Sequence, residues 1–234
     1  MATTKKPQML RGKVALWASV LVVFVVAILL MMILIKPSGK PEPSTPVAVE
    51  TPKDEGGCNV PAGDTSAKPA MPKDLRWKAE KGWTWPVSDT YGPTKTKDGF
   101  PVCFARSPLG AALAAVSTNA SANLINAKKM VELYAVDSKG KDVLKEKMTD
   151  GPAMTDPPAS YSGFIVDSFN ENEASITLVV ATAASSSGYA GLPLTFQWVD
   201  GDWKVKVFDD GSTFVGQPPT PIKGGFVEWR GTNG

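Results

Sequence analysis

Apolar and polar residues are distributed unevenly along this chain, and the longest apolar run lies near its start. Residues 14–35 read VALWASVLVVFVVAILLMMILI, without charge, proline or glycine. The 22 residues of this run would form a helix about 33 Å long, enough to cross a hydrocarbon core of about 30 Å. A signal peptide has a shorter apolar region followed by a small-residue cleavage site, which this run lacks. The pattern therefore predicts a single transmembrane helix at residues 14–35.

The charges beside this run predict its orientation. Four basic residues precede it, namely Lys5, Lys6, Arg11 and Lys13. No acidic residue occurs before Glu42. Because basic residues favour the cytoplasmic side of a membrane, we expect residues 1–13 to form a cytoplasmic tail. The C-terminal domain would then lie outside the cytoplasm, attached to the cell membrane.

Two segments beyond the apolar run lack a regular period. Residues 36–75 are rich in Pro, Ser, Thr, Lys and Glu, a composition that predicts a disordered, Pro-rich linker. Residues 76–106 form an aromatic arm, which we expect to be irregular apart from a short strand. Its aromatic side chains either pack on the domain that follows or form a partner surface, since Trp and Tyr are frequent in interfaces. The candidate partner surface consists of Trp77, Trp83, Trp85 and Tyr91.

Three helices are predicted at the start of the next segment, residues 107–211. Ser107 can cap the first helix, and Pro108 suits its first position. Apolar residues then recur at helical spacing. A second helix is expected over about residues 121–136 and a third over about residues 141–148.

Alternating apolar and polar residues then predict antiparallel strands, the first two over residues 161–169 and 173–183. The clearest hairpin turns at residues 200–201, an Asp-Gly pair that suits a two-residue type I′ turn. This register sets Trp198 opposite Trp203 and joins apolar residues on one face. A slip by one residue would destroy that match, so the pattern strongly favours this pairing.

Helices followed by strands indicate an α+β fold with helices on one face of an antiparallel sheet. The expected organisation is a single N-terminal transmembrane helix, a Pro-rich linker, and helices packed on a curved, cone-like antiparallel sheet. Residues 212–234 are rich in Gly and Pro and would form a C-terminal tail.

The chain has two cysteines, Cys58 and Cys103, and no histidine. Outside the cytoplasm these cysteines could form a disulfide; two free thiols are the alternative. No C-x-x-C pair and no His/Cys cluster is present, so we expect neither a metal site nor a cofactor.

Charge and motifs exclude several functions. Four of the 25 basic side chains precede the apolar run and none of the 23 acidic ones does, so residues 36–234 carry 21 basic and 23 acidic side chains, a net charge of −2. Direct nucleic-acid binding is therefore not expected. No nucleophile elbow, P-loop, zinc-protease motif or dinucleotide fingerprint occurs. Asp167, Tyr161 and Tyr189 could line a cone, but such residues in strands are more often rim residues, so we expect no catalytic residue.

Two segments carry a resemblance to a known family. QWVDGDWKV at residues 197–205, after predicted helices, resembles the end of nuclear-transport-factor-2-like cone domains. FARSPLGAALAA at residues 104–115 resembles membrane-anchored proteins of actinobacterial integrative conjugative elements. The resemblance covers roughly residues 72–210. It implies a non-enzymatic structural subunit of a conjugative, type IV secretion-like transfer complex, and it assigns no role to any numbered residue.

Two function classes follow from these observations. A transfer-complex scaffold would have the membrane, further copies of itself and other membrane subunits of the complex as partners. The alternative is a membrane-tethered extracytoplasmic module that binds a small molecule or a cell-wall fragment. A binding module requires an open, apolar cavity with a few convergent polar groups, whereas a cone filled by its own Trp and Phe side chains would argue against it.

Overall fold

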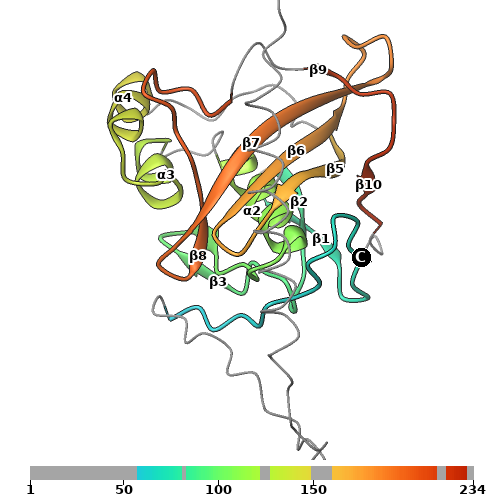
Figure 1. Cartoon of the computed structure of the whole chain (residues 1–234), viewed down its shortest axis with the longest axis horizontal. Helices are drawn as coiled ribbons and strands as arrows, with labels where there is room; N and C mark the ends of the chain where they lie inside the picture. Colours follow the sequence, from blue (N-terminus) through green and yellow to red (C-terminus); the bar gives the residue numbers. More distant parts are fainter. Residues whose placement is uncertain (1–56, 81–82, 122–126, 149–159, 215–219, 231–234) are drawn as a thin grey trace, which may run out of the picture. The chain divides into compact units, whose positions relative to one another are not determined.

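A six-stranded antiparallel sheet is the centre of the computed structural model, which describes residues 57–80, 83–121, 127–148, 160–214 and 220–230 (Figure 1). Five strands follow the order β10-β5-β6-β7-β8, and β9 pairs with β7 beyond the end of β8. The strands are β5 Ser160–Phe169, β6 Glu173–Ala181, β7 Tyr189–Val199, β8 Asp202–Val205, β9 Thr220–Pro221 and β10 Val227–Glu228.

Three helices in this part of the chain pack on the sheet and on one another: α2 (Pro108–Ser121), α3 (Ala127–Tyr134) and α4 (Lys139–Lys147). The central helix, α2, contacts β5, β6 and β8, while α3 contacts both other helices and β8 (Figure 1). Ser107 begins α2, because its Oγ accepts a 3.1 Å hydrogen bond from the N–H of Gly110. Nearly every residue of α2 is buried, so this Ala-rich helix forms the core between the sheet and the remaining helices.

The predicted register of the hairpin between β7 and β8 is confirmed from the Phe196–Val205 pair to the Val199–Asp202 pair. Trp198 lies opposite Trp203, and their ring centroids are 5.0 Å apart. The turn residues Asp200 and Gly201 have φ angles of 53° and 77°, as a type I′ turn requires. The predicted strands at 161–169 and 173–183 correspond to β5 and β6.

The aromatic arm is more regular than its sequence predicts. It contains two antiparallel hairpins, one of β1 (Arg76–Glu80) with β2 (Trp83–Val87) and one of β3 (Lys95–Lys97) with β4 (Phe100–Val102). Strand β2 packs on α2, so the arm is part of the domain. Its short strands contain prolines at 86 and 101, which masks the alternation that would have revealed them.

The expected disordered linker extends too far toward the C-terminus. From Gly57 onward the chain is described, and Leu75 is only 1% exposed in the main core. Gly63 lies against the ring of Tyr91, where an added Cβ would clash with it. Residues 57–75 therefore belong to the folded domain, while residues 36–56 lie outside the described residues.

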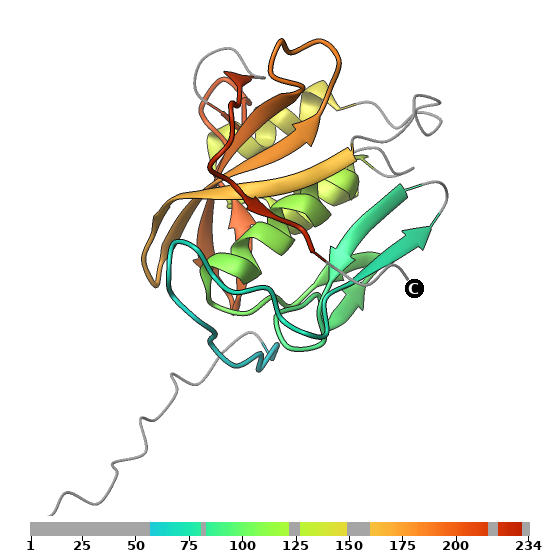
Figure 2. The same ribbon diagram turned by 90° about the vertical axis from the view of Figure 1, so that its right-hand side faces the viewer.

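The segment from β9 to β10 crosses the face of the sheet opposite α2 (Figure 2). It begins on the β7 edge and ends on the β5 edge. Ile222 covers Gly191, and Phe226 covers Gly163 and contacts the ring of Tyr189 at 5.2 Å. We call residues 220–229 the C-terminal strap, since they join the two edges of one sheet.

The expected fold class needs a correction. The described residues form an α+β fold with a large antiparallel sheet, but none of their helices is long and apolar enough to cross a membrane. The longest of them, α2, has 14 residues and spans about 21 Å, short of a bilayer core of about 30 Å. The expected fold class, which includes a transmembrane helix, is therefore wrong for the described structure. The expected tail and span, residues 1–13 and 14–35, lie outside the described residues.

Candidate ligand-binding pocket

A cavity of about 310 Å³ lies between the helices and one end of the sheet. All three described helices contribute to its wall, together with β7, β8 and the loop of residues 211–214. Met130 and Tyr134 come from α3, Leu144 from α4, and Leu194 and Val205 from the sheet. The pocket is thus formed where these six segments meet.

Local sequence explains why these segments turn apolar side chains to the pocket. Met130 and Tyr134 are four residues apart on α3, and Leu144 and Met148 are four apart along α4 and its C-cap, so each pair shares a helix face. Leu194 precedes Phe196, the partner of Val205, by two residues and therefore lies on the same sheet face. The wall is apolar because the inner faces of both layers meet there.

Two polar side chains at the pocket, Asn119 of α2 and Tyr134 of α3, are already hydrogen-bonded to the protein. The hydroxyl of Tyr134 donates to the carbonyl of Pro101 at 2.7 Å, and the hydroxyl of Tyr161 donates to Asn119 Oδ1 at 2.7 Å. Burial raises the pKa of both tyrosines, so both phenols stay neutral at physiological pH. The two phenols hold the walls in place and do not offer charge to a ligand.

Thr118 also lines the pocket and differs from these groups. Its side chain is 8% exposed, and within the described part of the chain its Oγ1 is buried without a hydrogen-bond partner. A buried hydroxyl in this state costs about 1–3 kcal/mol of stability. This wall position is therefore energetically unfavourable in the unliganded fold.

The loop at the rim of the pocket is held by Asp210. Its Oδ1 accepts from the N–H and from the hydroxyl of Ser212, at 2.9 and 2.7 Å, and its carbonyl accepts from Lys147 of α4. The hydrogen bonds from Ser212 lower the pKa of Asp210. The carboxylate is thus already paired within its own loop.

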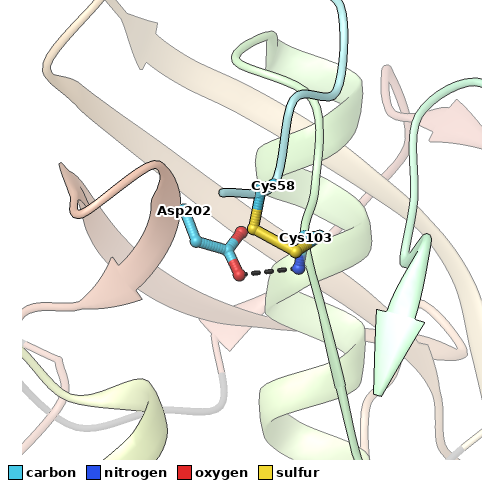
Figure 3. Close-up of side chains that lie close together, drawn as sticks. All are labelled: Cys58, Cys103 and Asp202. Atoms are coloured by element: carbon cyan, nitrogen blue, oxygen red, sulfur yellow. Dashed lines mark hydrogen bonds between the residues drawn. A yellow bond between two sulfur atoms is a disulfide. The ribbon is translucent and has the colours of Figure 1, made fainter. Parts of the chain in front are cut away.

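A second cluster contains the two cysteines and Asp202 (Figure 3). Cys58 and Cys103 form a disulfide with their Cα atoms 5.1 Å apart. The Asp202 carboxylate accepts from the N–H groups of Cys103, Phe104 and Trp203 at 2.7, 3.0 and 3.0 Å. Burial raises the pKa of Asp202, and the three N–H donors partly oppose that rise.

This cluster fits a structural role better than a metal or redox role. The two sulfurs and one carboxylate oxygen lie within 4.8 Å of one another, but bridged sulfurs offer no thiolate to a metal ion. A neighbouring carboxylate also disfavours the thiolates that reduction would create. The disulfide therefore fixes residue 58 to the start of the core.

The four aromatic residues proposed as a partner surface have different environments. Trp85 is 5% exposed and belongs to the core, with Lys78 Nζ 5.5 Å from the centre of its ring. Trp77 and Tyr91 are half-buried against the same core. Trp83 belongs to β2, but its side chain lies outside the described set. None of the three described side chains is fully exposed, so packing on the domain explains their positions.

The residues considered for catalysis are not brought together. Asp167 accepts a 2.7 Å hydrogen bond from Thr177 on the sheet face opposite the helices, whereas Tyr161 reaches α2 through Asn119. Tyr189 contacts the C-terminal strap. These three side chains therefore do not form one site.

Sequence reasoning did not locate the pocket. The predicted helix over about residues 121–136 includes the lining residues Val131 and Tyr134, but an apolar stripe that fills a core and one that lines a cavity have the same spacing. The rim residues 211–214 overlap the expected C-terminal tail, residues 212–234. Nothing in their sequence indicates that they lie beside α4 at the pocket.

These features define the described part of the chain as an α+β domain with an apolar pocket and one disulfide. The chain belongs to the family described as "Domain of unknown function (DUF8175)", whose sequence profile matches residues 38–228. No curated protein and no solved structure matches it. The resemblance to conjugative-element proteins and to cone domains therefore stays a prediction.

Proposed function

We propose that this protein is a non-enzymatic binding protein that holds a small molecule in the pocket between α2, α3, α4 and the sheet. The observation that carries the proposal is the apolar pocket of about 310 Å³. Its size lies at the lower end of the range of about 300–1,000 Å³ typical of small-molecule sites. Such sites combine apolar walls with a few polar groups, and this wall contains the polar side chains of Asn119, Ser212 and Thr213.

The disulfide supports a location outside the reducing cytoplasm. Disulfides persist in secreted, periplasmic and surface compartments and are rare where thiols are kept reduced. Cys103 is 3% exposed, so the bridge is an integral part of the fold. The proposed binding therefore takes place in an oxidising, extracytoplasmic compartment.

The wall chemistry favours binding over catalysis. General acid–base catalysis needs a group whose pKa lies near the working pH, and burial moves the pKa of Tyr134 away from neutrality. The lining residues supply neither a carboxylate nor an amine to activate Thr118 as a nucleophile. A ligand bound there would be released without chemical change.

A structural subunit of a transfer complex remains the expectation from the sequence resemblance. No described feature favours it over a binding protein. Cross-linking in the native membrane tests the expected partners, namely copies of this chain and other membrane subunits. Recovery with a transfer ATPase would support the scaffold.

The binding function can be tested on the full-length chain carrying ¹³C-methyl methionine. Met130 and Met148 line the pocket, so their ε-methyl NMR signals report on its occupancy. The probes are 2-naphthol, 2-naphthoate and 2-naphthylmethylammonium, which share one ring system and differ in charge. Saturable shifts of both signals with at least one probe are expected, and the absence of shifts with all three would overturn the function.

A matched pair of variants localises the binding. Leu144→Trp places an indole in the pocket and is expected to abolish the shifts, since Leu144 is a lining residue. Glu146→Trp adds the same indole at an exposed position of the same helix and should leave them unchanged. Equal binding by both variants would show that the probes sit elsewhere.

A further inference from the structure

We infer that this pocket selects uncharged, largely apolar ligands of about two fused aromatic rings or a chain of about ten carbons. The inference rests on the proposed binding function and adds the chemical class of the ligand. Three properties of the pocket carry it: the absence of charge in its wall, the engagement of its polar groups, and its volume.

The wall offers no partner to a charged ligand. All the described lining residues are uncharged. At the rim, the ammonium of Lys147 donates to the carbonyl of Asp210, and the carboxylate of Asp210 accepts from Ser212. On the adjoining helices, Lys141 pairs with Glu132 and Asp137. A charged group that enters the pocket would lose hydration without gaining an ion pair, which is unfavourable.

The wall also offers few directional contacts. Asn119 Oδ1 is bonded to Tyr161, and the Tyr134 hydroxyl to the carbonyl of Pro101. Recognition must therefore come mainly from apolar contact with side chains such as Leu194. Met130 and Met148 have flexible, polarisable side chains that adapt to different shapes, so the pocket suits a class of molecules.

The volume sets the size of the ligand. An apolar cavity of about 150 Å³ stays dry and binds benzene, and this pocket of about 310 Å³ is roughly twice as large. Two fused rings match it. A larger ligand would extend beyond the apolar wall through the open side of the pocket.

The charge series of probes tests this selectivity on the full-length wild-type chain at pH 7. From the Met130 and Met148 methyl shifts, 2-naphthol is expected to bind at least tenfold more tightly than 2-naphthoate and 2-naphthylmethylammonium. If either ion binds as tightly as 2-naphthol, the inference is wrong while the binding function stands. If none of the three binds, both are wrong.

A designed reversal provides an independent check. Leu194→Lys places a cation in the wall and is expected to tighten 2-naphthoate binding at least fivefold relative to the wild-type chain. Leu192→Lys is the matched control, because Leu192 is also half-buried on β7, on the same face, and does not line the pocket. Equal gains in both variants would contradict the assignment, and the wild-type series decides the question if Leu194→Lys fails to fold.

Discussion

Asp202 and Cys103 are 99 residues apart in the sequence, and a 2.7 Å hydrogen bond from the N–H of Cys103 to Asp202 Oδ2 joins them. The other oxygen, Oδ1, accepts from the N–H of Phe104 at 3.0 Å. Asp202, the first residue of β8, thereby holds in place the segment that leads into α2. Both carboxylate oxygens are needed for this contact.

Replacing Asp202 by Asn is expected to lower the free energy of unfolding by about 1–3 kcal/mol, since an amide NH₂ group cannot accept from the second N–H. Urea unfolding measures the change. Asp200→Asn is the control, because Asp200 is exposed in a positive-φ turn position that Asn tolerates well. Equal losses in both variants would show that the turn, not the carboxylate contact, is responsible.

Removing the disulfide should be the most destabilising of these changes. Its cysteines are 45 residues apart, and a loop of that length is worth about 4 kcal/mol in the chain-entropy model. Cys58→Ala/Cys103→Ala should therefore melt at a markedly lower temperature than the wild-type chain. Adding a reductant should bring the wild-type melting temperature close to that of the variant and leave the variant unchanged. The prediction would be contradicted if complete reduction of the disulfide left the melting temperature of the wild-type chain unchanged.

Replacing Thr118 by Val should stabilise the unliganded protein. The change removes a buried hydroxyl that has no partner in the described structure and keeps the side-chain shape, so the free energy of unfolding should rise by about 1 kcal/mol. Thr177 is equally buried, at 8% exposure, but donates to Asp167. Thr177→Val should therefore lower the stability by a similar amount. A destabilised Thr118→Val variant would mean that this hydroxyl has a partner.

The contact of Asp74 with Ser88 and Thr90 of the aromatic arm should stabilise the fold less in acid. Burial alone would raise the pKa of Asp74, but hydrogen bonds from Thr90 and Ser88 outweigh it and hold this pKa below the usual 3.8. Because the folded-state pKa is the lower one, the stabilisation by Asp74 is complete above pH 3.8 and is lost as the pH falls through the folded value.

Urea midpoints at pH 7 and at pH 3 for wild type and Asp74→Asn test this effect. The variant should be less stable at pH 7, and the difference from wild type should shrink at pH 3. Asp209→Asn, at an exposed position, should follow the wild-type chain at both values. If the urea midpoints of wild type and Asp74→Asn differ by the same amount at pH 7 and at pH 3, Asp74 does not contribute to the loss of stability in acid.

The sequence predicted those parts of the fold where a local pattern and a long-range pairing agree. The Trp198–Trp203 pairing is an example, since turn chemistry and strand alternation specify one register. The β1–β2 and β3–β4 hairpins were missed because their strands are short and one strand of each, β2 and β4, contains a proline. The two-residue strand β10 carries no periodic signal at all.

The candidate pocket was beyond sequence reasoning for a different reason. Whether Met130 or Leu144 fills a core or lines a cavity depends on how far apart the helices and the sheet lie. That separation is set by contacts elsewhere, such as Lys147 with the rim loop and Tyr161 with Asn119. The residue types along the chain do not reveal this separation.

The C-terminal strap has a consequence for aggregation. Strands β9 and β10 pair with β7 and β5 at opposite edges of the same sheet and cover backbone groups there. A chain terminated before residue 220 would expose backbone N–H and C=O groups on both edges, a recognised route to aggregation. The strap therefore protects both edges of the sheet from pairing with another chain.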